Sequence, residues 1–242
     1  MRMKRSRSGI RAAAALLSVS MVMGGAGLAE KPPPTHLQES SVPVLLVPGW
    51  YSTGRDMAPL LIRLVAAGWA EDHVMAMTFS DPTGSNRDHA REIVAAVDSL
   101  REVTGAERVD IVAHSMGGLA TRLYLEEGGA AHVRRVVFIA TPQRGTYTAY
   151  LAFGRGRDEM IPGSDFLKAL NSGPSVPPGV EALTLRTMVD AHIVPEESAT
   201  LPGVPDLEVC CPTHEGLLAD MDVFRAVWQF LTHGTSDGGD GQ

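Results

Sequence analysis

The chain has 242 residues, of which 44% are hydrophobic, and a formal net charge of −7 at pH 7. This length suits one folding domain, since α/β folds of this size commonly form a single core and the sequence shows no internal repeat. The acidic balance argues against nucleic acid as a partner, because the basic residues cluster at the N-terminus and the remainder is more acidic still.

Residues 1–29 have the pattern of a secretory signal peptide. Five basic residues precede the uncharged stretch AAAALLSVSMVMGGAGLA, which ends in small residues. Cleavage is expected before Glu30 or, alternatively, after Ala26, and an uncleaved membrane anchor is the competing interpretation. We therefore expect a secreted protein, extracellular or periplasmic. The proline-rich, polar residues 30–41 that follow are expected to form a linker.

Apolar runs alternate with helical patterns from residue 42 onward. Six runs are too continuous for one-sided strands, and strands buried on both faces indicate a parallel sheet. The predicted strands are residues 42–47, 73–79, 108–113, 134–140, 182–189 and 207–211, and the predicted helices are residues 57–67, 117–127 and 215–231 with another around residues 93–103.

Such alternation with right-handed crossovers predicts a doubly wound, three-layer α/β sandwich over residues 42–233. Its sheet is expected to be mainly parallel, with about six strands. Residues 234–242 are expected to be a disordered tail. Residues 145–180 interrupt the pattern with many Gly and Pro residues. They are predicted to form a lid or a pocket wall, and an ordinary surface loop is the alternative. Within them, Ser164 is expected to cap a short helix.

The sequence AHSMGG, residues 113–118, lies between a predicted strand and a predicted helix. A nucleophile on such a sharp turn needs small residues two positions before and after it, so that the backbone folds back without a clash. Ala113 stands where the pattern G-x-S-x-G has its first glycine, and Gly117 supplies the second. The pattern predicts Ser115 as a nucleophile, and a serine that merely caps the helix is the alternative.

An acid and then a histidine should follow this serine, each in a loop at the carboxyl end of a later strand. Asp190 directly follows the fifth predicted strand, and His214 lies shortly after the sixth. His214 would take the proton of Ser115, and Asp190 would fix the histidine tautomer. Other candidates fit this order less well and are interpreted as surface, buried or supporting residues: His114, His192, His233, Asp110 and Asp206.

Two backbone N–H groups should stabilise the developing oxyanion. Met116 supplies the first, because its amide follows the nucleophile. The second should come from the loop PGWYSTG after the first predicted strand, with Trp50 as the expected donor and Tyr51 as the next choice.

Residues 42–231 resemble the small secreted bacterial triacylglycerol lipases, especially the minimal lipases of bacilli. The likeness rests on VLLVPGW, VDIVAHSMGGLATRLYL, VDAHIVP and THEGLL, in this order. It implies the α/β hydrolase fold and, by position, Ser115, Asp190 and His214 as the catalytic triad. Three features depart from that family: Pro48-Gly49 replaces His-Gly, residues 140–150 and 161–171 have no counterpart in the shortest members, and CCPTH replaces a glycine-containing approach to the histidine.

The resemblance implies a secreted carboxylic ester hydrolase, a triacylglycerol lipase or esterase, that works through an acyl-enzyme without metal or organic cofactor. Its expected partner is a small-molecule or lipid ester, met in solution or at a lipid–water interface, and a monomer is expected. An acyltransferase, a phospholipase or a non-catalytic binding protein of the same fold are the alternatives.

The two cysteines, Cys210 and Cys211, are adjacent. The sequence leaves three states open for them: a vicinal disulfide, a disulfide with another chain, or free thiols. Two adjacent thiols lack the spacing of a zinc site. Calcium binding also stays open, although no loop offers ordered oxygen ligands.

Overall fold

The computed structural model describes residues 42–234. The predicted signal peptide, the linker and residues 235–242 of the predicted tail lie outside the described residues. Within the described part, no helix is both long and apolar enough to cross a membrane.

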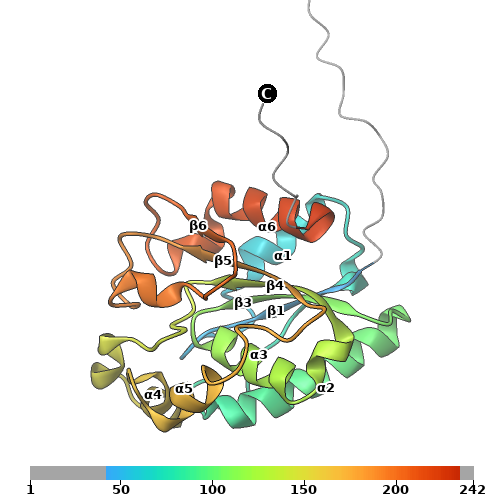
Figure 1. Cartoon of the computed structure of the whole chain (residues 1–242). Helices are drawn as coiled ribbons and strands as arrows, with labels where there is room; N and C mark the ends of the chain where they lie inside the picture. The colour runs from blue at the N-terminus through green and yellow to red at the C-terminus, as the bar shows by residue number, and fades with distance from the viewer. Residues whose placement is uncertain (1–41, 235–242) are drawn as a thin grey trace, which may run out of the picture. The chain divides into compact units, whose positions relative to one another are not determined.

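Six strands form a single sheet in the order β2-β1-β3-β4-β5-β6, and every neighbouring pair is parallel (Figure 1). The sheet is therefore entirely, not mainly, parallel. The strands are β1 (Val44–Val47), β2 (Val74–Ala76), β3 (Val109–His114), β4 (Val133–Ile139), β5 (Glu181–Arg186) and β6 (Asp206–Glu208). Four strands, β1, β2, β5 and β6, are shorter than the sequence predicts.

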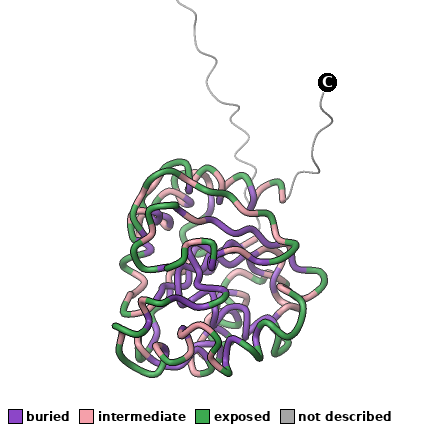
Figure 2. Tube along the Cα trace, turned by 60° about the vertical axis from the view of Figure 1, so that its left-hand side comes forward, coloured by how far each residue is buried: buried purple, intermediate pink, exposed green. Residues whose placement is uncertain are grey.

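Helices cover both faces of the sheet, so the predicted three-layer α/β hydrolase fold is confirmed (Figure 1). On one face lie α1 (Ala58–Ala66) and α6 (Met221–His233), and on the other α2 (Asn86–Thr104) and α3 (Met116–Glu126). The alternation of side chains along β1 divides its residues between two cores: Leu45 and Val47 join the α2–α3 side, and Val44 and Leu46 join the other. Figure 2 shows the buried strands enclosed by more exposed segments.

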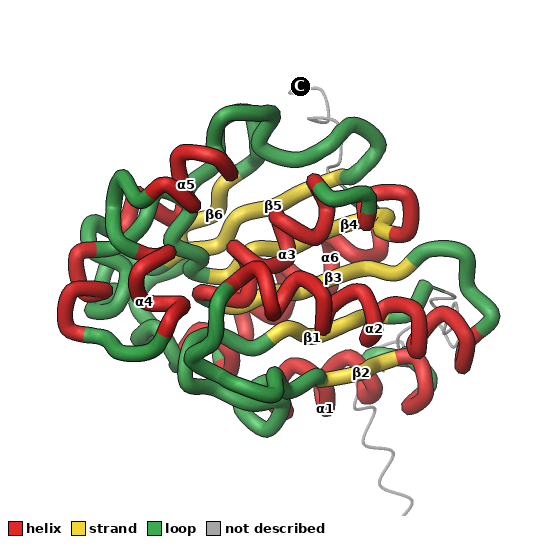
Figure 3. Tube along the Cα trace, turned by 90° about the horizontal axis from the view of Figure 1, so that it is seen from below, coloured by secondary structure: helices red, strands yellow, loops and turns green. Residues whose placement is uncertain are grey.

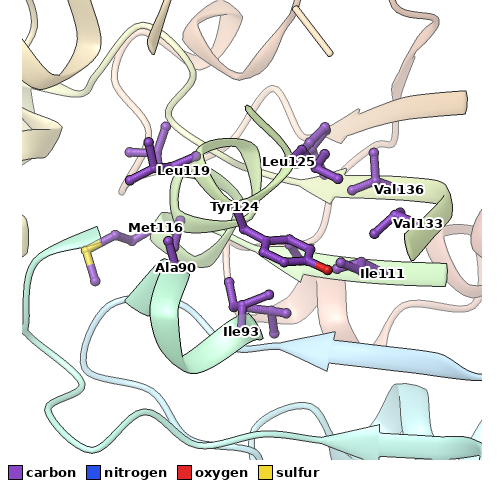
Figure 4. Packing of buried hydrophobic residues seen from close by; sticks show 14 of the residues in the cluster. Ala90, Ile93, Ile111, Met116, Leu119, Tyr124, Leu125, Val133 and Val136 are labelled. Atoms are coloured by element: carbon purple, nitrogen blue, oxygen red, sulfur yellow. The ribbon is translucent and has the colours of Figure 1, made fainter. Parts of the chain in front are cut away.

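The core on the α2–α3 side fixes the helix that follows Ser115. Figure 4 shows the ring of Tyr124, on α3, beside Ile93 of α2 and Ile111 of β3. All ten residues from Met116 to Leu125 are buried. A helix buried all round is held by its neighbours on every side, which gives its N-terminus, and hence the nucleophile turn, a fixed position.

Local signals in the sequence explain where several helices begin and end. Ser85 accepts a hydrogen bond from the main-chain N–H of Asp88 at the start of α2, and Gly105, with φ 70°, ends it. As predicted, Ser164 caps a short helix, α5 (Asp165–Leu170). The last helix begins later than predicted, at Met221, because Asp220 caps it after a separate 3₁₀ turn (Gly216–Ala219).

Residues 145–180 contain a helix that the sequence did not indicate, α4 (Arg155–Met160). Figure 3 shows α4 and α5 together beyond one end of the strands. Polar contacts attach α4 to the start of α2: Glu159 accepts hydrogen bonds from the main-chain N–H and the side-chain amide of Asn86, and Arg155 pairs with Asp88 at 2.6 Å. Two short helices therefore stand over the end of the sheet where Ser115 lies.

Candidate active site

Ser115 occupies the turn between β3 and α3 with a strained backbone. Its φ of 51° and ψ of −131° lie in a region that residues other than glycine rarely adopt. Its side chain makes no capping hydrogen bond with α3. The alternative in which this serine only caps the helix is thus not observed, and the backbone has the sharp turn expected for a nucleophile.

Two glycines allow other segments to approach this turn closely. A Cβ on Gly49 would lie 2.8 Å from the Cβ of Ser115, and a Cβ on Gly117 would overlap the carbonyl oxygen of Pro48. Only glycine therefore lets the loop after β1 lie against the turn after β3, which brings Trp50 to the same place.

Asp190 and His214 meet at the carboxyl end of the sheet. The Nδ1 of His214 lies 2.8 Å from Oδ2 of Asp190, and the side chains are 6% and 2% exposed. The other oxygen, Oδ1, accepts the main-chain N–H groups of His192 at 2.8 Å and Ile193 at 2.9 Å. The two main-chain N–H groups hold the carboxylate in place, and the carboxylate in turn fixes the ring orientation of His214.

The charge of this carboxylate is also favoured. Burial by itself would raise the pKa of Asp190, but the hydrogen bond and charge of His214, together with the N–H groups of Ile193 and His192, outweigh it. The net result is a pKa below the usual value for aspartate. Asp190 is therefore ionised at neutral pH and faces His214 as an anion.

Ser115 and His214 line the same cavity, whose volume is about 720 Å³. Within the described residues, no hydrogen bond joins the Ser115 hydroxyl to His214. Such hydrogen bonds are often long without substrate and tighten only in the complex. The serine and histidine predicted from the sequence thus face one space, with Asp190 behind His214, although the serine–histidine contact itself is not formed.

Residues from the 145–180 segment form a wall of this cavity. Ala149, Leu151, Ala152 and Met160 line it. The indole N–H of Trp50, on the opposite loop, donates to the carbonyl oxygen of Phe153 at 3.0 Å, and their rings are 4.9 Å apart. This contact ties the loop after β1 to the 145–180 segment beside the cavity.

The main chain distinguishes the two oxyanion candidates in the loop after β1. The N–H of Tyr51 already donates to the carbonyl oxygen of Pro82 at 3.0 Å. No hydrogen bond from the main-chain N–H of Trp50 occurs within residues 42–234, and Trp50 lines the cavity. Met116 is the first residue of α3, so its N–H precedes the helical hydrogen-bond ladder. Trp50 and Met116 therefore remain the predicted donors.

Three of the other candidate residues have partners elsewhere. Asp110 is buried and pairs with Arg134, Asp206 pairs with Arg186 at the sheet edge, and His233 packs on Trp228. None of these three lines the cavity.

Two other histidines flank His214, which the sequence did not indicate. The ring of His114 lies 4.6 Å from that of His214 and the ring of His192 lies 4.9 Å from it, centroid to centroid. His114 is buried, whereas the His192 side chain is 54% exposed. Their positions close to Ser115 and Asp190 in the sequence could have indicated this. The conformation of the loops decides, however, whether such side chains point toward His214.

The sequence predicts no metal site, but the described part of the chain contains one group of three possible metal ligands. One ligand atom from each of Asp190, His192 and His214 lies within 4.8 Å of the others. Cys210 and Cys211 are joined as a vicinal disulfide, one of the three states that the sequence leaves open.

Comparison with known proteins supports the resemblance to bacterial lipases and esterases. A curated triacylglycerol lipase from Burkholderia plantarii is 28% identical over 163 residues, which are 60% of this chain and 43% of the relative. The match thus spans less than half of that lipase.

Solved structures show the same fold. Lipase B from Aspergillus fumigatus superposes with a TM-score of 0.70 at 20% identity, covering 79% of this chain and 52% of the lipase. The mature lipase BlEst2 from Bacillus licheniformis has a TM-score of 0.67 at 16% identity, covering 84% of this chain and 94% of its own. Both similarities show the α/β hydrolase fold.

A family described as a domain of unknown function, DUF7379, matches residues 28–152, which is more than half of the 242 residues. This region includes the loop after β1 and the turn at Ser115, and it ends before Asp190 and His214. The chain therefore belongs to the DUF7379 family, and its fold is that of the α/β hydrolases.

Proposed function

We propose that the protein is a carboxylic ester hydrolase of the lipase and esterase type, with Ser115 as nucleophile, His214 as general base and Asp190 as its orienting acid. The observation that carries this proposal is the buried hydrogen bond of 2.8 Å between Asp190 and His214, at the wall of the cavity that Ser115 also lines. The positive φ of Ser115, without a capping bond, supports the same role.

In this reaction the hydroxyl of Ser115 attacks the ester carbonyl, and the Nε2 atom of His214 takes its proton. The charged ring is stabilised by Asp190, which stays ionised. The tetrahedral intermediate collapses as His214 returns the proton to the leaving alcohol, and an acyl group remains on Ser115. Water, activated by the same histidine, then releases the carboxylic acid.

The main-chain N–H groups of Met116 and Trp50 would hold the oxyanion in both steps. Because the first is at the start of α3, the dipole of that helix also favours negative charge there.

The cavity favours neutral esters with an apolar acyl part. Apolar side chains form much of its wall, and two of the lining residues, Tyr51 and Leu151, are large, apolar and exposed. Asp56 and Glu215 also line it, so an anionic phosphate group would meet carboxylates. We therefore favour acylglycerols and other neutral esters, taken up from solution or from a lipid surface, over phospholipids.

Secretion is part of the proposal. It is based on the leader-like residues 1–29, and the disulfide of Cys210 and Cys211 supports an oxidising compartment. Expression of the full chain with detection of cleaved protein outside the cytoplasm tests it, and full-length protein retained in the cytoplasm would contradict it.

The activity is tested with p-nitrophenyl esters and the variant Ser115→Ala, which should lose activity to near the uncatalysed background. The matched control is Ser99→Ala, at an exposed position on α2, which should keep the original rate. Labelling of the wild-type protein by a fluorophosphonate, absent in Ser115→Ala, would identify the nucleophile. Absence of any adduct on the wild type would instead favour a non-catalytic binding protein.

Substrate class needs a second measurement. Rates with triacylglycerols of graded chain length, below and above their solubility limit, separate a lipase, whose rate rises at the limit, from an esterase. Product analysis with an alcohol in competition with water separates hydrolysis from acyl transfer, because both pass through the same acyl-serine.

A further inference from the structure

We infer that Asp190, His192 and His214 form a binding site for a zinc ion, and that zinc bound there inhibits the enzyme reversibly. The binding follows from the side chains alone. Its inhibitory effect rests on the proposed function, because it requires His214 to be the general base.

Three donor atoms of the right kind are already close together. One ligand atom from each residue lies within 4.8 Å of the other two. In a tetrahedral zinc site with ligands at about 2.0–2.2 Å, ligand atoms lie about 3.3–3.6 Å apart. The remaining difference is small enough for a side-chain rotation to remove.

The site combines two fixed ligands with one adjustable ligand. The buried carboxylate of Asp190 is held by main-chain N–H groups and by the ring of His214. The side chain of His192, by contrast, is 54% exposed and stands at the cavity wall. It can therefore turn toward the other two without disturbing the core.

A fourth ligand is available beside them. The Nδ1 atom of His192 lies 3.4 Å from an Oε1 atom of Glu215, whose side chain is 66% exposed. Either this carboxylate or a water molecule would complete the tetrahedron. Two imidazoles with one or two carboxylates form a donor set that suits zinc better than magnesium or calcium, which prefer oxygen ligands.

Zinc at this site would stop the proton transfer from Ser115. If zinc binds Nε2 of His214, it occupies the lone pair that accepts the serine proton. If it binds Nδ1, coordination replaces the hydrogen bond to Asp190 and the ring proton moves by way of solvent to Nε2, which then has no lone pair for the serine proton. In either case His214 no longer acts as a base, and removal of zinc restores it.

Binding is measured by titrating zinc chloride into the purified, untagged protein in a calorimeter. We expect one zinc ion per chain, and at least tenfold weaker binding for His192→Gln. The matched control is His73→Gln, because Nδ1 of His73 also lies 2.8 Å from a carboxylate, that of Asp72, without belonging to a group of three. This control should bind zinc as the wild type does.

Inhibition is measured as the ratio of ester hydrolysis with and without zinc for each variant, so that changes in basal rate cancel. Wild type and His73→Gln should lose activity with zinc and regain it with EDTA, and His192→Gln should need at least tenfold more zinc. Wild-type protein that binds no zinc, or His192→Gln that binds it equally well, would overturn the site.

The two proposals fail in different ways. Zinc binding that depends on His192, in a protein that hydrolyses no ester, would support the metal site and refute the proposed function. Ester hydrolysis that depends on Ser115, in a protein without zinc binding, would refute only the metal site.

Discussion

The Nε2–H of His114 donates to the main-chain carbonyl oxygen of His214 at 3.2 Å, so the residue before the nucleophile holds the backbone of the predicted base. The carbonyl can only accept, which places the proton on Nε2 of His114 and leaves its Nδ1 as an acceptor. That Nδ1 atom is buried without a hydrogen-bond partner among the described residues. The histidine in AHSMGG is therefore a positioning residue for His214.

Replacing His114 tests this positioning role. His114→Leu removes the donor, and kcat should fall about tenfold, the equivalent of one hydrogen bond of about 1.4 kcal/mol, with little change in KM. His114→Gln can still offer an N–H at a similar reach and should recover much of the rate. The kinetics should be compared at temperatures where circular dichroism shows all three proteins folded. Equal losses in both variants would indicate a packing role only.

The same histidine should make stability depend on pH. Burial, and next the charge of His214, lower the pKa of His114 from 6.5 to about 3, against the opposing effects of its hydrogen bond and of Asp190. Between these values the unfolded chain binds a proton that the folded chain does not, so acidification favours unfolding.

Urea unfolding at pH 7, 6, 5 and 4 measures this effect. Below pH 6.5 the wild type should lose about 1 kcal/mol of unfolding free energy per pH unit relative to His114→Gln. His132→Gln, outside the cavity, controls for the loss of a histidine as such. Parallel pH dependences for wild type and His114→Gln would contradict the assignment.

Asp190→Asn should lower kcat by about 10³–10⁴-fold, because a neutral amide cannot stabilise the charged ring as the anion does and can hold the ring in the wrong tautomer. The control is Asp206→Asn. Asp206 is another candidate aspartate near a late strand, but it pairs with Arg186 at the sheet edge. Initial rates with a p-nitrophenyl ester decide between them. A larger loss of rate in Asp206→Asn would contradict the role of Asp190 as the acid.

Gly49→Ala should lower kcat by about 10²-fold, because its Cβ would lie 2.8 Å from Ser115 Cβ and push the Trp50 amide away from the oxyanion. Gly173→Ala is the matched control, since its Cβ would meet nothing within 4 Å. Fluorophosphonate labelling rates alongside kcat would show whether the reactive serine itself is affected. Full activity in Gly49→Ala would exclude this loop as the source of the second donor.

Buried strands made the fold predictable from the sequence. The runs at β1, β3 and β4 are apolar on both faces, and that pattern indicates a parallel sheet whatever the loops do. The helix α4 was not predicted, because RGRDEM is short and polar. It is held by contacts with α2, in particular Glu159 with Asn86. Such long-range contacts leave no periodic signal in the local sequence.

The candidate site was predictable only in its order along the chain. Ser115, Asp190 and His214 each follow a strand, so their meeting at one edge is a consequence of parallel topology. The inward turn of His114 and the approach of His192 depend on loop conformation, which spacing does not encode. The roles of these residues stay predictions until the variants are measured.

The two halves of the site also differ in how firmly the fold supports them. Ser115 follows β3, which has partners on both sides, whereas His214 follows β6, an edge strand of three residues that pairs with β5 alone. Segments with few partners open at lower free energy than the global unfolding of a domain. Mild denaturant should therefore abolish hydrolysis by releasing the loop that carries His214, while the central strands and the strained serine turn remain folded.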